Sequence, residues 1–280
     1  MTTWGAASRQ PWWRTGSAVA GAVLLLVAVA GAAAPWLAPH DPAAQLDLLR
    51  LKNAPPSGAH LFGTDPFSRD LLSRALYGAR TSLSIGLLGA IVSTLIATAW
   101  GTIAGSLPER LGDAVMGVVD TFRAVPRKIV LLAILLFFPQ PSTLTLAILL
   151  GVINWTTLSR VVFVQVRVVR AREFVVSARA LGASSTRVLV RHVAPHLAGS
   201  LLAASAVLVA DLLAVEASLS FLGLGVRPPA ASWGSILQDG VPYLTTAWWV
   251  AAVPCVLLVA TVLSVAHLAD AADHRGDTAR

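Results

Sequence analysis

The segment REFVVSARALGASS (Arg172 to Ser185) lies inside residues 160–195, the longest strongly charged interval of an otherwise apolar chain. That interval carries one acid, Glu173, and seven of the 21 lysines and arginines. The seven are Arg160, Arg167, Arg170, Arg172, Arg179, Arg187 and Arg191. Long apolar segments flank the interval on both sides. Basic residues gathered beside apolar spans are typical of cytoplasmic loops in membrane proteins, so we predict such a loop here.

The composition is that of a membrane protein. Of the 280 residues, 56% are hydrophobic and 12% are charged, whereas soluble domains have about 25% charged residues. The formal net charge is +7, but its clustering beside apolar segments makes nucleic acid a poor partner. The single cysteine, Cys255, excludes a disulfide framework and a cysteine-based metal site. We therefore expect an all-α integral membrane protein whose apolar surface faces lipid.

Six apolar segments come close to or exceed the length of about 20 residues that crosses a bilayer. They cover residues 17–37, 81–106, 114–138, 143–164, 197–224 and 246–268. Arg9 and Arg14 precede the first segment and indicate a cytoplasmic N-terminus; a cleaved signal peptide is the alternative for this segment. Six spans then bring the C-terminal tail and the charged interval to the cytoplasmic side. The third span contains charged residues and Pro126, so either it begins late or its inner half lines water.

Residues 39–80 form a polar segment that the same count places outside. Asp65 is a candidate helix N-cap, with Pro66 at the first helical position. Apolar residues then recur on one helical face as far as Leu76, which predicts a short helix lying on the membrane surface. Basic residues in this segment conflict with the charge rule for outer loops. They are Arg50, Lys52, Arg69, Arg74 and Arg80.

The charged interval has a helix–break–helix pattern. Apolar residues recur at helical spacing from Phe174 to Leu181, and Gly182 can supply the left-handed residue that ends a helix. A serine at position 184 or 185 can cap a second helix that runs to Pro195. Such a helix suits insertion into a groove on a partner protein, or it rests on anionic lipid; periodicity alone does not separate the two.

This region resembles the coupling loop of ABC-transporter permeases, whose pattern is Glu-Ala-Ala-x-x-x-Gly followed further on by Leu-Pro. Residues 176–182 match the register, with Ala194-Pro195 at the Leu-Pro position. Val176 stands where the pattern has Glu, and Ala194 stands where it has Leu. The resemblance implies docking to an ATPase subunit through Glu173, Phe174, Val176, Ser177, Ala178, Leu181, Gly182 and Pro195.

Two further stretches resemble the permeases of dipeptide, oligopeptide and nickel importers. Residues 62–70 are similar to their external Gly-Thr-Asp-x-x-Gly-Arg-Asp motif, with Ser68 at the second Gly. The matching motif residues are Gly63, Thr64, Asp65, Arg69 and Asp70. Residues 216–229, followed by residues 232–234, are similar to the end of that family's fifth span.

The resemblance covers about residues 17–270 and implies the type I ABC importer permease fold, with a helix–turn–helix coupling loop on the cytoplasmic side. We expect three parts. Residues 1–80 hold the N-terminal tail, the first span and the external loop, residues 81–270 hold the five-span core, and residues 271–280 form a cytoplasmic tail.

The resemblance also implies the partners of the chain. These are a second homologous permease forming a heterodimer, one or two ABC ATPase subunits and an extracytoplasmic solute-binding protein, in a bacterial inner membrane. The ATPase subunits would bind ATP and Mg, since this chain has no glycine fingerprint for nucleotides and is not expected to be an enzyme. Short peptides are the expected solute, with nickel or a metal chelate as the alternative. An ion-coupled secondary transporter is disfavoured because the sequence shows no clear internal repeat.

Polar residues at membrane depth are candidates for the solute path. They are Asp120, Asn154, Arg160, Asp211 and Glu216. Asp211 and Glu216 are rotated by about 140° on one helix and cannot share a face well. The alternative is that they pair with basic residues of the third span or of the partner permease. The histidines are scattered without metal-site spacing, so no metal site is expected.

Overall fold

The computed structural model describes residues 12–137, 141–226 and 228–278, which are helices and connecting segments with one isolated β-bridge between Thr64 and Asp70. The helices are α1 (Trp12–Ala32), α2 (Ala34–Leu37), α3 (Leu71–Ser106), α4 (Glu109–Ala124), α5 (Arg127–Phe137), α6 (Thr143–Arg170), α7 (Glu173–Ala180), α8 (Ser185–Val188), α9 (Ala194–Phe221), α10 (Trp233–Gly240) and α11 (Trp248–Thr278). A π-helical turn, Leu189–Val193, joins α8 to α9, and a 3-10 turn, Val241–Tyr243, follows α10.

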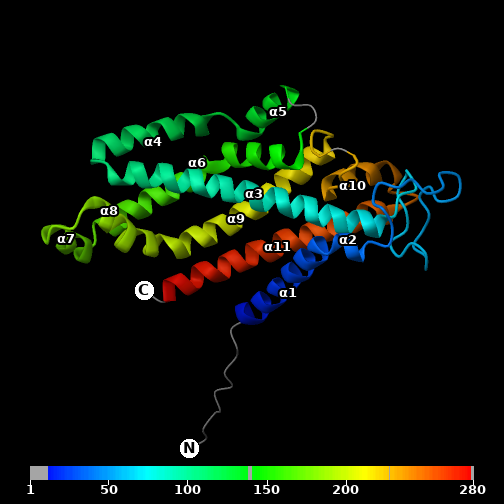
Figure 1. Cartoon of the computed structure of the whole chain (residues 1–280), viewed down its shortest axis with the longest axis horizontal. Helices are drawn as coiled ribbons and strands as arrows, with labels where there is room; N and C mark the ends of the chain where they lie inside the picture. The colour runs from blue at the N-terminus through cyan, green and yellow to red at the C-terminus, as the bar shows by residue number, and fades with distance from the viewer. Residues whose placement is uncertain (1–11, 138–140, 227, 279–280) are drawn as a thin grey trace, which may run out of the picture.

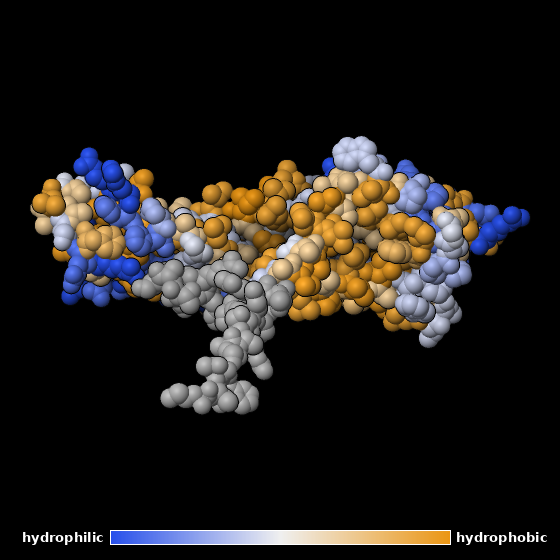
Figure 2. Space-filling model, turned by 90° about the horizontal axis from the view of Figure 1, so that it is seen from below, coloured by the Kyte–Doolittle hydropathy of each residue, from blue (hydrophilic) through white to orange (hydrophobic). Residues whose placement is uncertain are grey.

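The helices form one elongated bundle (Figure 1). The helices α7 and α8 lie at one end, and α10 lies at the other end beside the segment that joins α2 to α3. Figure 2 shows hydrophobic side chains over the middle of the visible face and hydrophilic ones gathered at both ends. This distribution is expected when the long axis of a bundle crosses a bilayer, and it confirms the all-α membrane class.

Four described helices are long and apolar enough to cross a membrane. They are Leu71–Ser106, Thr143–Arg170, Ser185–Phe221 and Trp248–Ala272. The helix of the predicted first span ends earlier than expected, because α1 runs from Trp12 to Ala32 and not to residue 37. Pro35 lies in the first turn of the separate helix α2. Since proline lacks an N–H and clashes with the preceding turn, one continuous helix through residue 37 is disfavoured.

Helices α3 and α6 pack closely because glycines leave no side chain between their backbones. A Cβ on Gly101 would lie 2.6 Å from the carbonyl oxygen of Ser159. A Cβ on Gly151 would lie 2.7 Å from the carbonyl oxygen of Gly89. Small residues allow this close approach between helices in membranes, and neither position has room for a larger residue.

The segment 114–138, predicted as a third span that either begins late or lines water in its inner half, is divided between α4 and α5. The helix breaks at Val125, which has an extended conformation with φ −86° and ψ 128°. The next residue, Pro126, disfavours helical geometry in the residue before it. The helices α4 and α5 follow one another along α3 and α6 (Figure 1). Residues 139 and 140, between the predicted third and fourth spans, lie outside the described residues, but Ser142 caps α6 by accepting a bond from the N–H of Thr145 at 3.1 Å.

The predicted surface helix capped by Asp65 is wrong. The helix α3 begins at Leu71, and its N-cap is Asp70, whose carboxylate accepts the N–H of Ser73 at 2.8 Å. Asp65 instead closes a tight turn in which Ser68 has a left-handed φ of +59°. A helix cannot pass through such a residue, so the helical pattern becomes continuous only after residue 70.

Residues 225–245, which lie between the predicted fifth and sixth spans, contain α10. Ser232 caps this helix, because its side chain accepts the N–H of Ser235 at 3.3 Å and the Ser235 hydroxyl accepts the N–H of Ser232 at 3.0 Å. Trp233 is fully buried, and its indole N–H donates to the carbonyl oxygen of Ala75 in α3 at 3.2 Å. The reciprocal serine pair is a local signal that could have predicted this helix.

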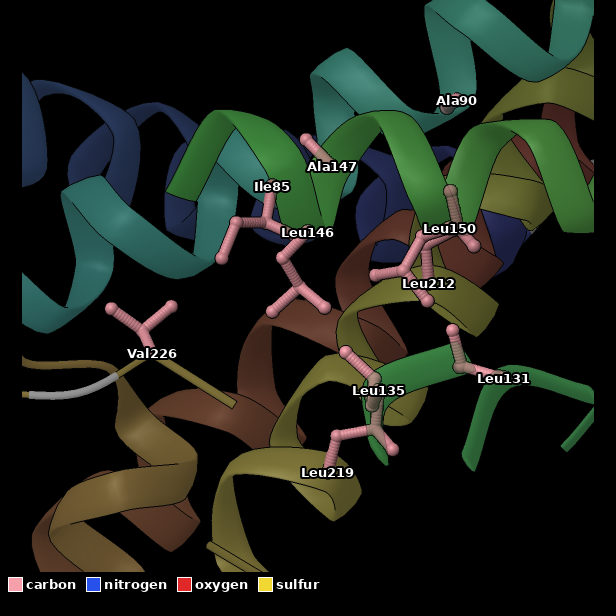
Figure 3. Packing of buried hydrophobic residues seen from close by; sticks show 10 residues of the cluster. All are labelled: Ile85, Ala90, Leu131, Leu135, Leu146, Ala147, Leu150, Leu212, Leu219 and Val226. Atoms are coloured by element: carbon pink, nitrogen blue, oxygen red, sulfur yellow. The ribbon is translucent and has the colours of Figure 1, made fainter. Parts of the chain in front are cut away.

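One buried apolar cluster joins four helices (Figure 3). Its members are Ile85 and Ala90 of α3, Leu131 and Leu135 of α5, Leu146, Ala147 and Leu150 of α6, Leu212 and Leu219 of α9, and Val226. The cluster holds the short helix α5 against α6 and α9. It thereby fixes the position of the charged residues at the start of α5.

Candidate functional site

The predicted docking segment forms a helix–turn–helix at one end of the bundle (Figure 1). The helix α6 continues to Arg170, so the loop begins after this residue and not at Arg160 as predicted. A guanidinium nitrogen of Arg170 donates to the carbonyl oxygen of Gly105 at 3.2 Å, and Arg167 lies 3.0 Å from the carboxylate of Asp113. These two arginines therefore tie α6 to α3 and α4.

The helix α7 is followed by a left-handed glycine, as predicted. Gly182 has φ +87°, and the described residues place no atom within 4 Å of a Cβ built there. The N–H of Ala183 donates to the carbonyl oxygen of Ala178 at 3.0 Å, which is the long bond of a Schellman motif. Ser184 caps α8 by accepting the N–H of Arg187 at 3.3 Å. Backbone conformation, and not crowding, therefore favours glycine at position 182.

Val175 anchors α7 to the bundle. Its side chain is fully buried in a cluster with Val166 of α6, Val188 of α8 and Leu197 of α9. The sequence pattern missed this residue, because the periodic face drawn from Phe174 to Leu181 does not include it. Leu181 is instead 89% exposed.

The other predicted docking residues lie on the outer side of the segment. Phe174 is 40% exposed and stacks on the ring of His196, with the ring centroids 5.3 Å apart. Val176 is 55% exposed. Glu173, Ser177, Gly182 and Pro195 are exposed, and Ala178 is half-buried. The segment therefore presents apolar side chains outward from the end of the bundle.

Pro195 does not end a helix, contrary to the prediction. The chain is helical from Ser185 to Phe221, and a π-helical turn precedes the proline. In this turn the N–H of Ala194 donates to the carbonyl oxygen of Leu189. The wider turn accommodates a residue that lacks an N–H and whose ring needs space. The second half of the docking segment is thus continuous with the predicted fifth span.

A polar cavity of about 330 Å³ lies between α4, α5, α6 and α9. Its polar lining consists of Arg123, Arg127, Lys128, Asn154 and Asp211. Arg127 donates to the amide oxygen of Asn154 at 3.0 Å, and the amide nitrogen of Asn154 donates to the carbonyl oxygen of Leu150 at 2.8 Å. The structure thus brings two predicted path residues, Asn154 and Asp211, to one cavity with the three basic residues of the predicted third span.

Asp120 and Arg160, two other predicted path residues, pair with each other. A guanidinium nitrogen of Arg160 bonds to one carboxylate oxygen of Asp120, and Arg123 lies 3.8 Å from the other. The side chains of Asp120 and Arg160 are 43% and 38% exposed. Neither is among the residues that line the cavity, so this pair joins α4 to α6 beside it.

Glu216 lies apart from the cavity lining and is fully buried between α9 and α3. Its carboxylate accepts bonds from the hydroxyls of Ser82 at 2.9 Å and Ser220 at 2.7 Å. The Ser82 hydroxyl also accepts the N–H of Trp233 at 3.3 Å. In this structure the partners of Glu216 are serines that join α3, α9 and α10. They are not the basic residues of α4 and α5 that the sequence suggested.

The external motif forms a buried ion-pair cluster at the opposite end. One carboxylate oxygen of Asp65 accepts the N–H groups of Phe67 at 2.8 Å and Arg69 at 2.9 Å. The other oxygen accepts the guanidinium of Arg69 at 2.6 Å and that of Arg74. Both arginines also contact Asp239 of α10, at 2.8 Å and 2.9 Å. The sequence pattern predicted a membrane-surface helix that contains Arg69 and Arg74, whereas in the structure α10 covers both arginines and supplies the second acid.

Two further motif residues fix the segment before α3. Gly63 has φ +77°, and a Cβ on it would lie 2.5 Å from the carbonyl oxygen of Ala54. The Thr64 hydroxyl accepts the N–H of Ala54 at 2.9 Å and donates to the carbonyl oxygen of Leu51. These contacts close the loop over residues 51–64 without regular secondary structure.

Comparison with known proteins finds relatives over most of the chain. Residues 97–275 match the family described as binding-protein-dependent transport system inner membrane component. The oligopeptide transport system permease protein OppC of Bacillus subtilis (strain 168) is 34% identical over 229 residues, which cover 81% of this chain and 73% of that protein. The dipeptide transport system permease protein DppC of the same organism is 32% identical over 249 residues, covering 89% and 77%. The oligopeptide permease protein OppC of Mycobacterium bovis is 37% identical over 249 residues, covering 88% and 84%.

Proposed function

The chain belongs to the family of inner-membrane components of binding-protein-dependent transport systems, and we propose that it is the permease subunit of an ATP-driven importer of short peptides. The names of its relatives, which are oligopeptide and dipeptide permeases, support peptides as the solute. In this role the chain forms part of the translocation path, and partner subunits hydrolyse ATP.

One observation carries the proposal, namely the continuity between the docking segment and α9. The helix from Ser185 to Phe221 spans 37 residues. Val175 packs α7 against the start of this helix, and Asp211, further along it, lines the polar cavity. A force applied to α7 by an ATPase subunit would therefore reach the cavity through packed side chains and a rigid helix.

We assign the α7 end to the cytoplasm. The basic residues at this end favour that side, and α1 begins and α11 ends toward it (Figure 1). The ATPase subunits, with their ATP and Mg, would bind here. The external solute-binding protein would approach the opposite end, and the exposed apolar flanks of the bundle would face lipid and a second, homologous permease in a heterodimer.

The charges of the cavity suit a zwitterionic peptide. Asp211 offers a carboxylate to a peptide amino group, and Arg127 and Lys128 offer positive charge to a peptide carboxylate. Transition metals such as nickel, copper and zinc prefer histidine, cysteine or methionine ligands. None of these three residue types is among the described residues that line the cavity. This lining favours peptide over a free soft metal ion.

Uncoupling by substitution tests the docking role. Leu181→Glu places a charge on an 89% exposed side chain of the docking segment, so the fold should be kept. In the reconstituted transporter we expect this variant to lose both peptide-stimulated ATP hydrolysis and peptide uptake. Leu181→Met is the matched control, because it keeps an apolar side chain of similar volume at the same exposed position. If Leu181→Glu kept full hydrolysis and uptake, the docking assignment would be wrong.

A further inference from the structure

Two histidines and an aspartate meet where the segment after α2 reaches the first turn of α3. Nδ1 of His60 lies 2.9 Å from one carboxylate oxygen of Asp70, and Nδ1 of His40 lies 3.8 Å from the same oxygen. The centroids of the two imidazole rings are 4.9 Å apart. One candidate ligand atom from each residue lies within 4.8 Å of the others. The spacing of these residues along the chain gave no sign of this meeting.

The cluster lacks a full positive charge. Asp70 is fully buried, and its second carboxylate oxygen accepts the N–H and the hydroxyl of Ser73, each at 2.8 Å. The nearby guanidinium groups of Arg69 and Arg74 bond to Asp65 and Asp239 instead. Among the described residues, the ionic partners of Asp70 are therefore the two histidines alone. A buried carboxylate needs a compensating charge.

His40 also has an unused nitrogen. Its Nδ1 is buried and forms no hydrogen bond within the described part of the chain, although it faces Asp70. The side chain as a whole is 32% exposed, which leaves a route from solvent to the cluster. The backbone N–H of His40 donates to the Ser73 hydroxyl at 3.1 Å, so this segment is already held beside α3.

We propose that His40, His60 and Asp70 bind a divalent transition-metal cation of the Zn²⁺ class. Two histidine nitrogens and one carboxylate oxygen are a donor set that Zn²⁺ uses, with a fourth position left for water. Ligands at about 2.0 Å from a tetrahedral ion lie about 3.3 Å apart, and the separations of 2.9 Å and 3.8 Å lie on either side of that value. The cation supplies the charge that Asp70 lacks and joins the segment after α2 to the first turn of α3.

Metal binding by the purified full-length chain tests this site. The chain should carry an affinity tag without histidine and should be stripped with a chelator. It is then titrated with Zn²⁺ in competition with a chromophoric chelator. We expect one high-affinity ion per chain, and Co²⁺ at the same site should show the visible absorption of a four-coordinate complex. Bound Zn²⁺ should also raise the thermal midpoint of the chain.

His40→Ala is the main variant, because its side chain is partly exposed and its loss leaves the His60–Asp70 bond in place. It should weaken Zn²⁺ binding by at least about tenfold and remove the thermal shift, with an unchanged midpoint in the absence of metal. His60→Ala should also weaken Zn²⁺ binding, but it should lower the midpoint without metal as well, because it removes the buried His60–Asp70 bond. His196→Ala, at the other end of the bundle, is the control and should bind as the wild type does. Absence of binding by the wild type, or full binding by both His40→Ala and His60→Ala, would overturn the proposal. The test does not depend on the transport function.

Discussion

A guanidinium nitrogen of Arg74, in the first turns of α3, lies 2.9 Å from the carboxylate of Asp239 in α10, 165 residues further along the chain. The same nitrogen bonds to Asp65, and both Arg74 and Asp65 are buried, with side-chain exposures of 3% and 0%. Arg69 contacts the same two acids. Two arginines and two aspartates thus form one charge-balanced cluster that holds α10 and the external motif against α3.

Loss of one arginine from this cluster should be costly. Arg74→Ala leaves the buried carboxylate of Asp65 with one cation fewer, and breaking a buried pair in this way costs about 3–5 kcal/mol. The thermal midpoint of the purified chain in detergent measures the effect. Arg110→Ala, at an exposed position of α4, is the matched control and should change the free energy of unfolding by less than about 0.5 kcal/mol. Equal midpoints for the two variants would contradict the cluster's role.

Ser68→Gly should stabilise the protein. Ser68 has φ +59°, and its buried hydroxyl forms no hydrogen bond within the described residues. A left-handed conformation costs a residue with a Cβ about 1–2 kcal/mol, so glycine should raise the free energy of unfolding by about 1 kcal/mol. Ser68→Ala separates the two causes, because it removes the hydroxyl but keeps the Cβ. A midpoint for Ser68→Gly no higher than that for Ser68→Ala would show that backbone strain is not the cause.

The close packing of α3 on α6 predicts opposite outcomes for two glycines. Gly101→Ala forces a Cβ to within 2.6 Å of a backbone oxygen, and overpacking of this kind costs about 1–3 kcal/mol. Gly117 lies in α4, and a Cβ added to it would have no atom of the described residues within 4 Å. Gly117→Ala should therefore be neutral or stabilising by up to about 1 kcal/mol through helix propensity. The thermal midpoints of the two variants measure the effect, and a midpoint for Gly101→Ala as high as that for Gly117→Ala would contradict the prediction.

Adjacent valines in α7 should respond differently to truncation. Val175→Ala removes two buried methyl groups and should lower the free energy of unfolding by about 2 kcal/mol. Val176→Ala changes a side chain that is 55% exposed and should cost less than about 0.5 kcal/mol. In the assembled transporter, any loss of uptake by Val176→Ala should therefore come from weaker contact with the ATPase subunit and not from lower stability. The anchoring role of Val175 fails if both variants have wild-type stability.

Charge in the polar cavity should affect solute selection. Asp211→Asn removes the carboxylate that the proposed function assigns to a peptide amino group, and should reduce uptake of a free dipeptide by about tenfold, the equivalent of about 1.4 kcal/mol. Uptake of the same dipeptide with an acetylated amino group should be equal in Asp211→Asn and in the wild type. Glu216→Gln is the control, because Glu216 is buried away from the cavity and bonds to serines. Equal losses for both peptides would place Asp211 outside the solute path.

Much of the fold was predictable from short stretches of sequence, and the errors have local causes. The break at Val125 follows from Pro126, although the surrounding run of apolar residues predicts a span. The serine cap of α10 is likewise a local signal. The second span predicted from residue 81 begins too late, because the first turns of α3 are assigned to a separate helix that begins before Leu71. The helical pattern from Phe67 to Leu76 does not reveal the left-handed residue at Ser68. Of the predicted path residues, Asn154 and Asp211 reached one cavity, whereas Glu216 did not.

By itself the sequence determined the membrane class, the main spans and the turn at Gly182. These depend on hydropathy summed over neighbouring residues and on the conformational freedom of one glycine, both of which are local properties. Only the tertiary structure decided which polar groups are buried and with whom. Asp239 reaches Arg74, and Ser82 reaches Glu216 across 134 residues. His40 and His60 likewise meet at Asp70. No local pattern encodes such pairs, because the burial of a polar side chain is set by the element that packs over it, and that element can come from any part of the chain.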